Sequence, residues 1–242
     1  MRLTVLGSGD AFSGCGCNAG YLIDSRILVD CGAPVHVLVR RVGATVAGLR
    51  LMLITHFHAD HTFMVPMVLG SRTFSDTVDA ELIIAGPPGA REYVERLVSD
   101  GYGEGICRQM RSRARLSYVV LQDGSDETIL GYRIAAQAVV HSTGPSLAYT
   151  LSDETGTTIG FSGDSTRCAG LERAIRASDL FVCECTGWGK PVPGGHLSSD
   201  EVSELMSIYP GTRFVISHLA ERHELPGAIV AHDLLTLDVS RG

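Results

Sequence analysis

The sequence predicts an α/β protein, and three observations indicate this class. Short apolar runs alternate with amphipathic segments along nearly the whole chain, as in sheets covered by helices. Several runs, such as Leu51–Ile54, are apolar at every position, which is typical of strands buried on both faces. The chain has 242 residues and is 45% hydrophobic, enough for one large core. We therefore expect residues 1–242 to form a single domain.

The expected elements follow from apolar periodicity and from turn and capping residues. We expect strands at Arg2–Leu6, Tyr21–Ile23, Ile27–Val29, Leu51–Ile54, Glu81–Ala85, Leu116–Leu121, Tyr132–Val140, Leu147–Leu151, Thr157–Phe161, Leu180–Cys185 and Arg213–Ile216. We expect helices at Pro34–Arg41, at Ala90–Ser99 and at Leu171–Ala177. We expect a further helix that begins directly after His61 and ends at Leu69, and a last helix that begins at Ser198 and ends at about Ile208. Proline near the start and glycine after the end bound the first helix. The segment Ser198-Ser199-Asp200-Glu201 is a capping box that opens the last one.

The densest cluster of potential metal ligands directly follows the apolar run Leu51–Ile54. It comprises His56, His58, Asp60 and His61. Residues i and i+2 of an extended segment point to the same side, so His56 and His58 can face one cation. The chain must then turn, so that Asp60 and His61 can bind a second cation or the far side of the first. Imidazole nitrogen and carboxylate oxygen are the usual ligands of zinc and similar divalent metals.

Three further potential ligands stand close after apolar strands, namely His141, Asp164 and His218. Strand ends gathered along one edge of a sheet are where α/β proteins form their sites. With the opening cluster these residues supply seven ligands, enough for two metals that share a bridge. Asp30 also ends a strand, and we expect it to reach the opening cluster as a hydrogen-bonding partner of a ligand.

This ligand order resembles the metallo-β-lactamase superfamily, from Val5-Leu6-Gly7-Ser8-Gly9 to Ser217-His218. The resemblance implies a four-layer αββα sandwich and two divalent metal ions, with zinc expected and manganese or iron as alternatives. It implies one ion at His56, His58 and His141, a second at Asp60, His61 and His218, and Asp164 with a hydroxide between them. One major class of β-lactamases has cysteine where this chain has Asp164, which argues against that class.

Three finer matches are similar to the ribonuclease Z branch, which cuts tRNA precursors beyond their 3′ end. They are Glu184-Cys185-Thr186, Gly195-His196-Leu197-Ser198 and Ser217-His218-Leu219-Ala220-Glu221-Arg222. The resemblance implies that Glu184 and His196 act as a pair near the leaving group. The structural alternatives are a buried acid tied to an arginine for Glu184, and an ordinary loop histidine for His196.

The chain lacks one feature of that branch. Ribonuclease Z usually carries a protruding tRNA-binding arm between the positions of His141 and Asp164, where only a short hairpin fits here. The net charge of −7 removes a second contribution to tRNA affinity. Relatives without the arm include phosphodiesterases that act on cyclic nucleotides or other small phosphodiesters. The substrate candidates are therefore a small or cyclic phosphodiester and RNA.

We expect a binuclear metal-dependent phosphodiesterase, in which a metal-bridging hydroxide attacks phosphorus. Asp60 could orient or deprotonate this nucleophile, and His196, polarised by Glu184, could protonate the departing alkoxide. One alternative is a metallohydrolase of a carboxylic ester, lactone or thioester, because the same hydroxide attacks a carbonyl. The other is a non-catalytic, metal-binding, RNA-associated protein, which the complete ligand set disfavours.

Other features have two readings. Cys15 and Cys17 could bind a metal, but no second pair lies nearby, and ordinary loop thiols are the alternative. The arginines of segment 108–115 form either a solvated face or a phosphate-contacting patch. Seven scattered cysteines favour free thiols in a reducing cytoplasm. We expect no membrane span, since no apolar run approaches about 18 residues. A homodimer is implied by the resemblance alone.

Overall fold

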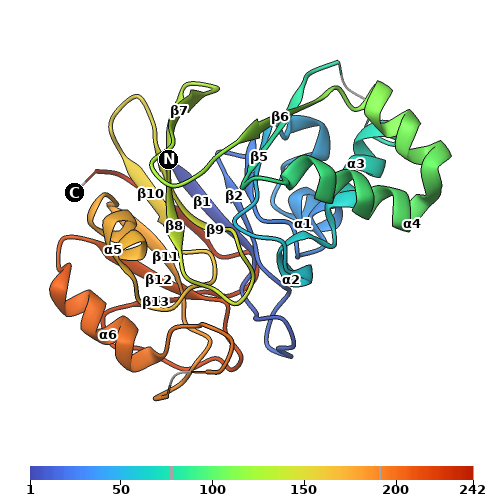
Figure 1. The fold of residues 1–242 in the computed structure, drawn as a ribbon. Helices are drawn as coiled ribbons and strands as arrows, with labels where there is room; N and C mark the ends of the chain where they lie inside the picture. The colour runs from blue at the N-terminus through green and yellow to red at the C-terminus, as the bar shows by residue number, and fades with distance from the viewer. Residues whose placement is uncertain (77–78, 191, 242) are drawn as a thin grey trace.

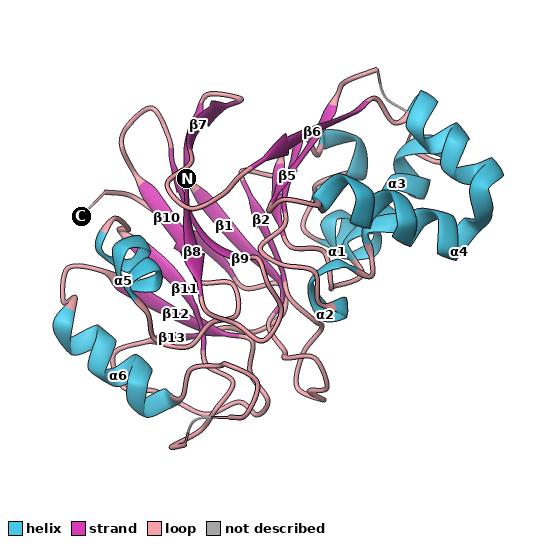
Figure 2. Cartoon of the chain, viewed as in Figure 1, coloured by secondary structure: helices cyan, strands magenta, loops and turns pink. Residues whose placement is uncertain are grey.

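The computed structural model describes residues 1–76, 79–190 and 192–241. Its strands form two seven-stranded sheets, each flanked by helices (Figures 1 and 2). No helix of the described residues is long and apolar enough to cross a membrane. The layer order follows from the three buried clusters described below.

The first sheet is formed by the N-terminal half of the chain together with the last strand. In spatial order it contains β14 (Thr236–Asp238), β1 (Arg2–Gly7), β2 (Gly20–Ile23), β3 (Ile27–Val29), β4 (Leu51–Leu53), β5 (Leu82–Gly86) and β6 (Leu116–Val120). From β3 to β6 the neighbours are parallel. The helical segments of this half are α1 (Val35–Arg41), the 3₁₀ turn η1 (Val46–Gly48), α2 (Ala59–Thr62), α3 (Val65–Phe74) and α4 (Ala90–Arg113).

The second sheet comes from the C-terminal half. In spatial order it contains β13 (Ile229–Val230), β12 (Arg213–Ser217), β11 (Leu180–Glu184), β10 (Thr158–Phe161), β9 (Ser146–Ser152), β8 (Tyr132–Val139) and β7 (Asp126–Ile129). Its helices are α5 (Ala169–Arg176) and α6 (Ser199–Ile208). Strands β10, β11 and β12 are parallel neighbours, so their carboxyl ends lie at one edge of the sheet.

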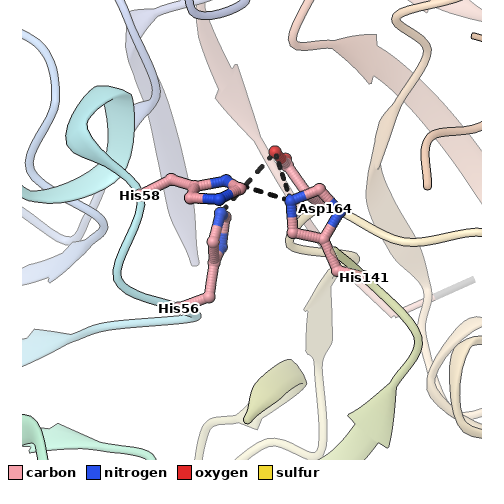
Figure 3. A group of neighbouring side chains, drawn as sticks. All are labelled: His56, His58, His141 and Asp164. Carbon is pink, nitrogen blue, oxygen red and sulfur yellow. Dashed lines mark hydrogen bonds and ion pairs between the residues drawn. The ribbon is translucent and has the colours of Figure 1, made fainter. Parts of the chain in front are cut away.

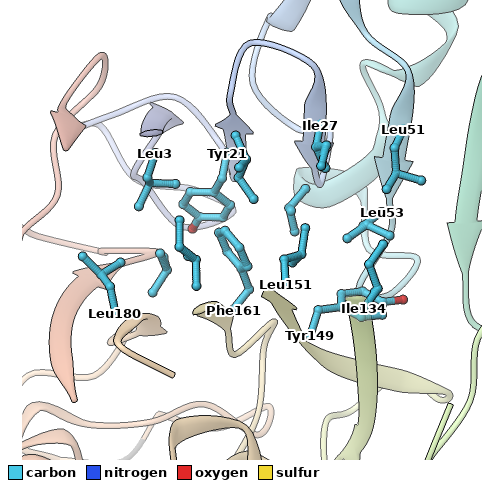
Figure 4. Packing of buried hydrophobic residues seen from close by; sticks show 14 of the residues in the cluster. Leu3, Tyr21, Ile27, Leu51, Leu53, Ile134, Tyr149, Leu151, Phe161 and Leu180 are labelled. Atoms are coloured by element: carbon cyan, nitrogen blue, oxygen red, sulfur yellow. The ribbon is translucent and has the colours of Figure 1, made fainter. Parts of the chain in front are cut away.

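Three buried apolar clusters separate the layers. The central one joins the facing sides of both sheets, where the ring centroids of Tyr21 and Phe161 lie 5.4 Å apart (Figure 4). A second cluster packs α1, α3 and α4 against the outer face of the first sheet, and a third packs α5 and α6 against the second sheet. The result is the predicted αββα sandwich, held together mainly by burial of apolar surface.

The expected strands are present, with each end displaced by at most one residue. Three short strands, β7, β13 and β14, were not predicted, because β7 and β14 are polar and exposed at most positions and β13 has two residues. The single helix expected from His61 to Leu69 is wrong. Two helices form there, and His61 lies inside the first. The predicted capping box of α6 is confirmed, with Ser198 and Glu201 bonding to each other's backbone amides.

The helix expected at Ala90–Ser99 continues to Arg113 as α4, through a kink at Gly103 with φ of 76°. Glycine adopts this left-handed conformation without the Cβ clash that other residues suffer. The arginines of segment 108–115 therefore lie on the last turns of α4 and just beyond it.

Candidate metal centre

The opening cluster combines extended and helical backbone, as its ligand spacing required. His56 lies just after β4, and His58, with φ of −65° and ψ of 154°, is the residue that caps α2. Asp60 and His61 then belong to the short α2 helix and are buried. Gly32 lies against the Asp60 backbone so closely that a Cβ there would overlap the Asp60 carbonyl oxygen. The turn in the motif thus depends on a glycine from the neighbouring strand end.

Four of the predicted ligands form a first group (Figure 3). His141 Nε2 lies 3.1 Å from His58 Nδ1 and 3.8 Å from Asp164 Oδ2. His56 Nε2 lies 3.7 Å from the same Asp164 oxygen. Candidate ligand atoms of the group all lie within 4.8 Å of one another, which is close enough to bind one ion.

A second group combines the remaining predicted ligands with the same aspartate. Asp60 Oδ2 lies 3.1 Å from His218 Nε2 and 3.5 Å from His61 Nε2. Asp164 Oδ1 lies 3.3 Å from His61 Nε2, and its Oδ2 lies 3.5 Å from His218 Nε2. Asp164 is therefore common to both groups, and the structure brings all seven predicted ligands together.

The donor set fits a divalent metal. His56 Nε2, His61 Nε2 and Asp164 Oδ1 are buried without a hydrogen-bond partner in the described residues. A buried polar atom without a partner is costly, so three at one point need an explanation. A cation that accepts their lone pairs provides it, and nitrogen and oxygen ligands suit zinc and its neighbours.

The outer nitrogens of the histidines are tied to fixed partners. His61 Nδ1 bonds to Asp30 Oδ2 at 2.8 Å, and His141 Nδ1 donates to the Gly195 carbonyl at 3.0 Å. His218 Nδ1 lies 2.8 Å from Thr186 Oγ1. Such contacts orient each ring and favour the tautomer with a free lone pair on the inner nitrogen.

Asp30 reaches the opening cluster, as predicted. Its buried carboxylate accepts hydrogen bonds from the Thr55 amide at 2.8 Å, from the Thr55 hydroxyl and from His61. Asp30 and His218 both have φ of 56°, a left-handed conformation that is uncommon outside glycine. Strained backbone of this kind gathers at functional sites, where surrounding contacts maintain it.

Burial and neighbouring charges shift the pKa values of the candidate ligands in opposite directions. Burial alone would raise the pKa of Asp164, but the charges of His218 and His61 outweigh it and hold this pKa well below its ordinary value. Burial would lower the pKa of His61, yet Asp164 and Asp30 raise it well above its usual range. Burial dominates at His56 and lowers its pKa strongly, which keeps that imidazole neutral. Neutral imidazole and ionised carboxylate are the metal-binding forms, so His61 with its raised pKa would release a proton when a metal binds.

Glu184 and His196 form a pair beside the second group. His196 Nδ1 lies 3.1 Å from Glu184 Oε1 and 3.8 Å from Asp164 Oδ2. Glu184 also accepts hydrogen bonds from the Ser165 amide at 3.0 Å and the Thr186 hydroxyl at 2.8 Å. Among the described residues no arginine pairs with Glu184, so its alternative reading as an arginine-bound structural acid is not supported.

The centre opens into a groove with a volume of about 540 Å³. The candidate metal ligands His58, Asp60 and His218 line one part of the groove, together with His196. Its other walls are mostly apolar. The volume lies within the range of roughly 300–1,000 Å³ that small-molecule sites occupy.

The remaining sequence candidates lie outside the centre. Cys15 and Cys17 belong to none of the possible metal groups of the described residues, and Cys15 Sγ contacts the Ser13 hydroxyl instead. Arg111 pairs with Glu95 at 2.7 Å, and Arg115 lies 3.6 Å from the exposed Asp79. The arginine segment 108–115 does not line the groove, which favours the solvated-face reading.

Sequence reasoning missed the threonines that orient the centre. Thr186 contacts Glu184 and His218, and Thr55 contacts Asp30 and the His56 ring. Their position directly beside ligand motifs is a usable signal, because small hydroxyl residues next to a ligand can reach its outer nitrogen.

The amino-acid sequence of this chain is similar to the sequences of known ribonuclease Z proteins. The chain is 23% identical over 310 aligned residues to ribonuclease Z of Methanosarcina acetivorans, covering 99% of this chain and 98% of that protein. It is 34% identical over 111 residues to ribonuclease Z of Haloferax volcanii, covering 44% of this chain and 34% of that protein. These matches confirm the predicted likeness to ribonuclease Z.

Solved structures show the same fold. The short form of human tRNase Z has a TM-score of 0.80 and 19% identity, with 99% of this chain and 100% of that chain covered. The metallo-β-lactamase fold protein YhfI of Bacillus subtilis has a TM-score of 0.79 and 17% identity, with 98% of each chain covered. A family model described as anti-Pycsar protein Apyc1 matches residues 1–207. The chain therefore belongs to the Apyc1 family of anti-Pycsar proteins, and it has the predicted metallo-β-lactamase fold.

Proposed function

We propose that this chain is a binuclear metal-dependent phosphodiesterase whose substrate is a small or cyclic phosphodiester. The observation that carries the proposal is the pair of ligand groups joined at Asp164, with Glu184 and His196 beside them. A metal-dependent hydrolase of ester bonds agrees with the ribonuclease Z relatives and with a solved diphosphatase of the PhnP family, which has a TM-score of 0.69.

The proposed roles follow from position and charge. Divalent metals, when bound, polarise a phosphoryl oxygen and lower the pKa of bound water toward neutrality. Asp60 lines the groove and can accept a proton from the attacking water. Burial would lower the pKa of His196, but its hydrogen bond to Glu184 raises it, so this imidazole is suited to donate a proton to the departing oxygen.

Two features favour a small substrate over tRNA. The hairpin of β9 and β10 occupies the region between His141 and Asp164, with no arm inserted there. Of the described residues that line the groove, none is lysine or arginine, whereas Asp10, Asp60 and Asp164 are acidic. Nucleic-acid backbones are held chiefly by lysine and arginine, so a chain of many phosphates finds little attraction here.

Three finer predictions belong to the same proposal. Histidine and carboxylate ligands make zinc the first choice of metal, with manganese and iron as alternatives. The free thiols at all seven cysteines agree with a reducing cytoplasm. A homodimer stays a prediction that rests on the resemblance to ribonuclease Z.

A side-by-side assay tests the proposal. Metal-loaded protein is incubated with a tRNA precursor that carries a 3′ trailer, a 2′,3′-cyclic nucleotide, a 3′,5′-cyclic nucleotide and a nitrophenyl carboxylic ester. We expect hydrolysis of at least one cyclic nucleotide. Cleavage of the tRNA precursor at a defined position would contradict the small-substrate assignment, and hydrolysis of the carboxylic ester alone would contradict a phosphodiesterase.

A further inference from the structure

Two buried tyrosines connect the two sheets beside the metal centre and have no part in the chemistry described above. Tyr21 lies on β2 of the first sheet, and Tyr149 lies on β9 of the second sheet. Both side chains are buried in the central apolar cluster between the sheets (Figure 4). A tyrosine buried among apolar side chains needs a partner for its hydroxyl group, so the position of each partner is informative.

Each hydroxyl group reaches the opposite sheet and bonds next to a candidate metal ligand. The Tyr21 hydroxyl donates to Ser217 Oγ at 3.0 Å, and Ser217 is the last residue of β12, directly before His218. The Tyr149 hydroxyl donates to the Ile54 carbonyl at 2.8 Å, just before the opening cluster begins. Each sheet therefore holds a ligand-bearing segment of the other.

A backbone hydrogen bond accompanies the contact of Tyr149. The Leu147 amide, from the same strand, donates to the Thr55 carbonyl at 3.0 Å. The second sheet thus holds the consecutive carbonyls of Ile54 and Thr55, directly before His56. This segment of the first sheet is attached to the second sheet at the point where its first ligand begins.

The metal centre is itself divided between the sheets. In each ligand group, some ligands follow a strand of the first sheet and the others follow strands of the second sheet. A shift of one sheet against the other therefore changes the distances between ligand atoms in both groups. Metal–ligand distances in protein sites keep within about 0.2 Å of their standard values. Apolar burial is non-directional and does not define the relative position of the sheets so closely, whereas hydrogen bonds are directional.

We propose that Tyr21 and Tyr149 are positioning residues, whose hydroxyl bonds fix the two sheets against each other at the metal centre. Tyr21 positions His218 in the second ligand group, and Tyr149 positions His56 in the first. The proposal rests on the proposed binuclear centre and is independent of the substrate. Removal of either hydroxyl group leaves every candidate ligand in the chain, so a loss of metal affinity reports on the arrangement of the ligands.

Tyr132 supplies a matched control, because it makes a similar bond at the opposite end of the sandwich. Tyr132 is the first residue of β8, and its hydroxyl donates to Asp24 Oδ2, in the turn between β2 and β3, at 2.7 Å. The ligand His141 follows the other end of β8. Tyr132→Phe therefore removes a hydroxyl bond between the sheets without touching the edge that carries the ligands.

Zinc affinity and stability are measured separately on the full chain. Metal is first removed with a chelator, and urea unfolding of the metal-free protein gives the stability of each variant. Zinc is then titrated in competition with a chromophoric chelator. The variants are Tyr21→Phe, Tyr149→Phe, the control Tyr132→Phe, and Ser217→Ala, which removes the bond of Tyr21 from its other end.

Two background substitutions identify which ion is affected. His58→Ala removes a ligand of the first group alone, and Asp60→Ala removes a ligand of the second group alone. We expect Tyr21→Phe to weaken zinc binding roughly tenfold in the His58→Ala background, where the second group is complete. Tyr149→Phe should do the same in the Asp60→Ala background, where the first group is complete.

The other variants show whether the effect depends on position. Ser217→Ala should weaken zinc binding as much as Tyr21→Phe, and the double variant should be no weaker, because the same bond is lost. Tyr132→Phe should keep the zinc affinities of the wild type, although its unfolding equilibrium constant should rise roughly fivefold.

Wild-type zinc affinity in a well-folded Tyr21→Phe or Tyr149→Phe protein would overturn the role of that tyrosine. An equal loss of zinc affinity in Tyr132→Phe would overturn the proposal as a whole, because the effect would then follow stability and not position. A wild-type chain that binds fewer than two zinc ions would contradict the binuclear centre itself, and the proposal with it. Failure of the proposed hydrolysis shows separately, as absent turnover by a protein that binds two ions.

Discussion

Replacing Asp30 with asparagine tests how the ring of His61 is held. The change keeps the side-chain shape but removes the charge and one acceptor from a carboxylate that receives three donors, the Thr55 amide, the Thr55 hydroxyl and His61 Nδ1, each at 2.8 Å. Loss of one charge-assisted hydrogen bond in a buried setting costs about 1.5–3 kcal/mol of unfolding free energy. Loss of such a partner of a metal ligand typically lowers metal affinity by about 10–100-fold.

The assay combines urea unfolding of the metal-free protein with competition for zinc against a chromophoric chelator. Chelation separates the two effects, since bound metal by itself stabilises the folded state. Asp238→Asn is the control, because Asp238 pairs with Arg2 at the surface at 3.0 Å and should show no measurable change in either assay. Wild-type zinc affinity in a well-folded Asp30→Asn variant would refute the role of Asp30 in orienting His61.

Asp164→Ala removes the carboxylate common to both ligand groups, so metal content measured by mass spectrometry should fall with turnover. Glu184→Gln should lower kcat by about 10²–10⁴-fold at unchanged metal content, and the alkaline limb of the pH profile should move to lower pH, because Glu184 raises the pKa of His196. Burial would raise the pKa of Asp153, but hydrogen bonds from Thr155 outweigh it and lower this pKa. The stability that these hydrogen bonds add to the folded state is therefore fully present above the ordinary pKa of aspartate. It is lost as the pH falls through the lowered pKa of Asp153. Asp153→Ala should thus cost about 1 kcal/mol in urea unfolding at pH 7, and this cost should shrink once the wild-type carboxylate is protonated.

The ligands could be predicted from the sequence because strand ends are local features. His141, Asp164 and His218 each follow an apolar run. Strands β10 and β12 run in the same direction, and β8 shares it because β8 and β10 are both antiparallel to β9, so the three strand ends lie at one edge. Asp30 could be predicted to reach the opening cluster for the same reason. The pairing of β3 with β4 places its strand end beside the one that leads to the histidines.

The features that could not be predicted depend on packing between segments that are distant in the sequence. The four-residue helix α2 is too short to be stable alone, and it forms where Gly32 allows the Asp60 backbone to approach closely. The groove is lined by loops that follow different strands. No local feature of the sequence therefore shows that Phe12 and Phe63 line the same groove. Short polar strands such as β7 form only because a neighbouring strand offers its backbone, which periodicity along one segment does not reveal.

Metal titration of the chelated protein tests the central claim most directly. Zinc or manganese is added in steps, and bound metal is measured together with hydrolysis of bis(4-nitrophenyl) phosphate and of a cyclic nucleotide. The two ligand groups joined at Asp164 predict that hydrolysis rises until two ions are bound per chain and then stays constant. Full hydrolysis with a single bound ion, or a protein with two bound ions that cleaves neither phosphodiester, would contradict a binuclear phosphodiesterase.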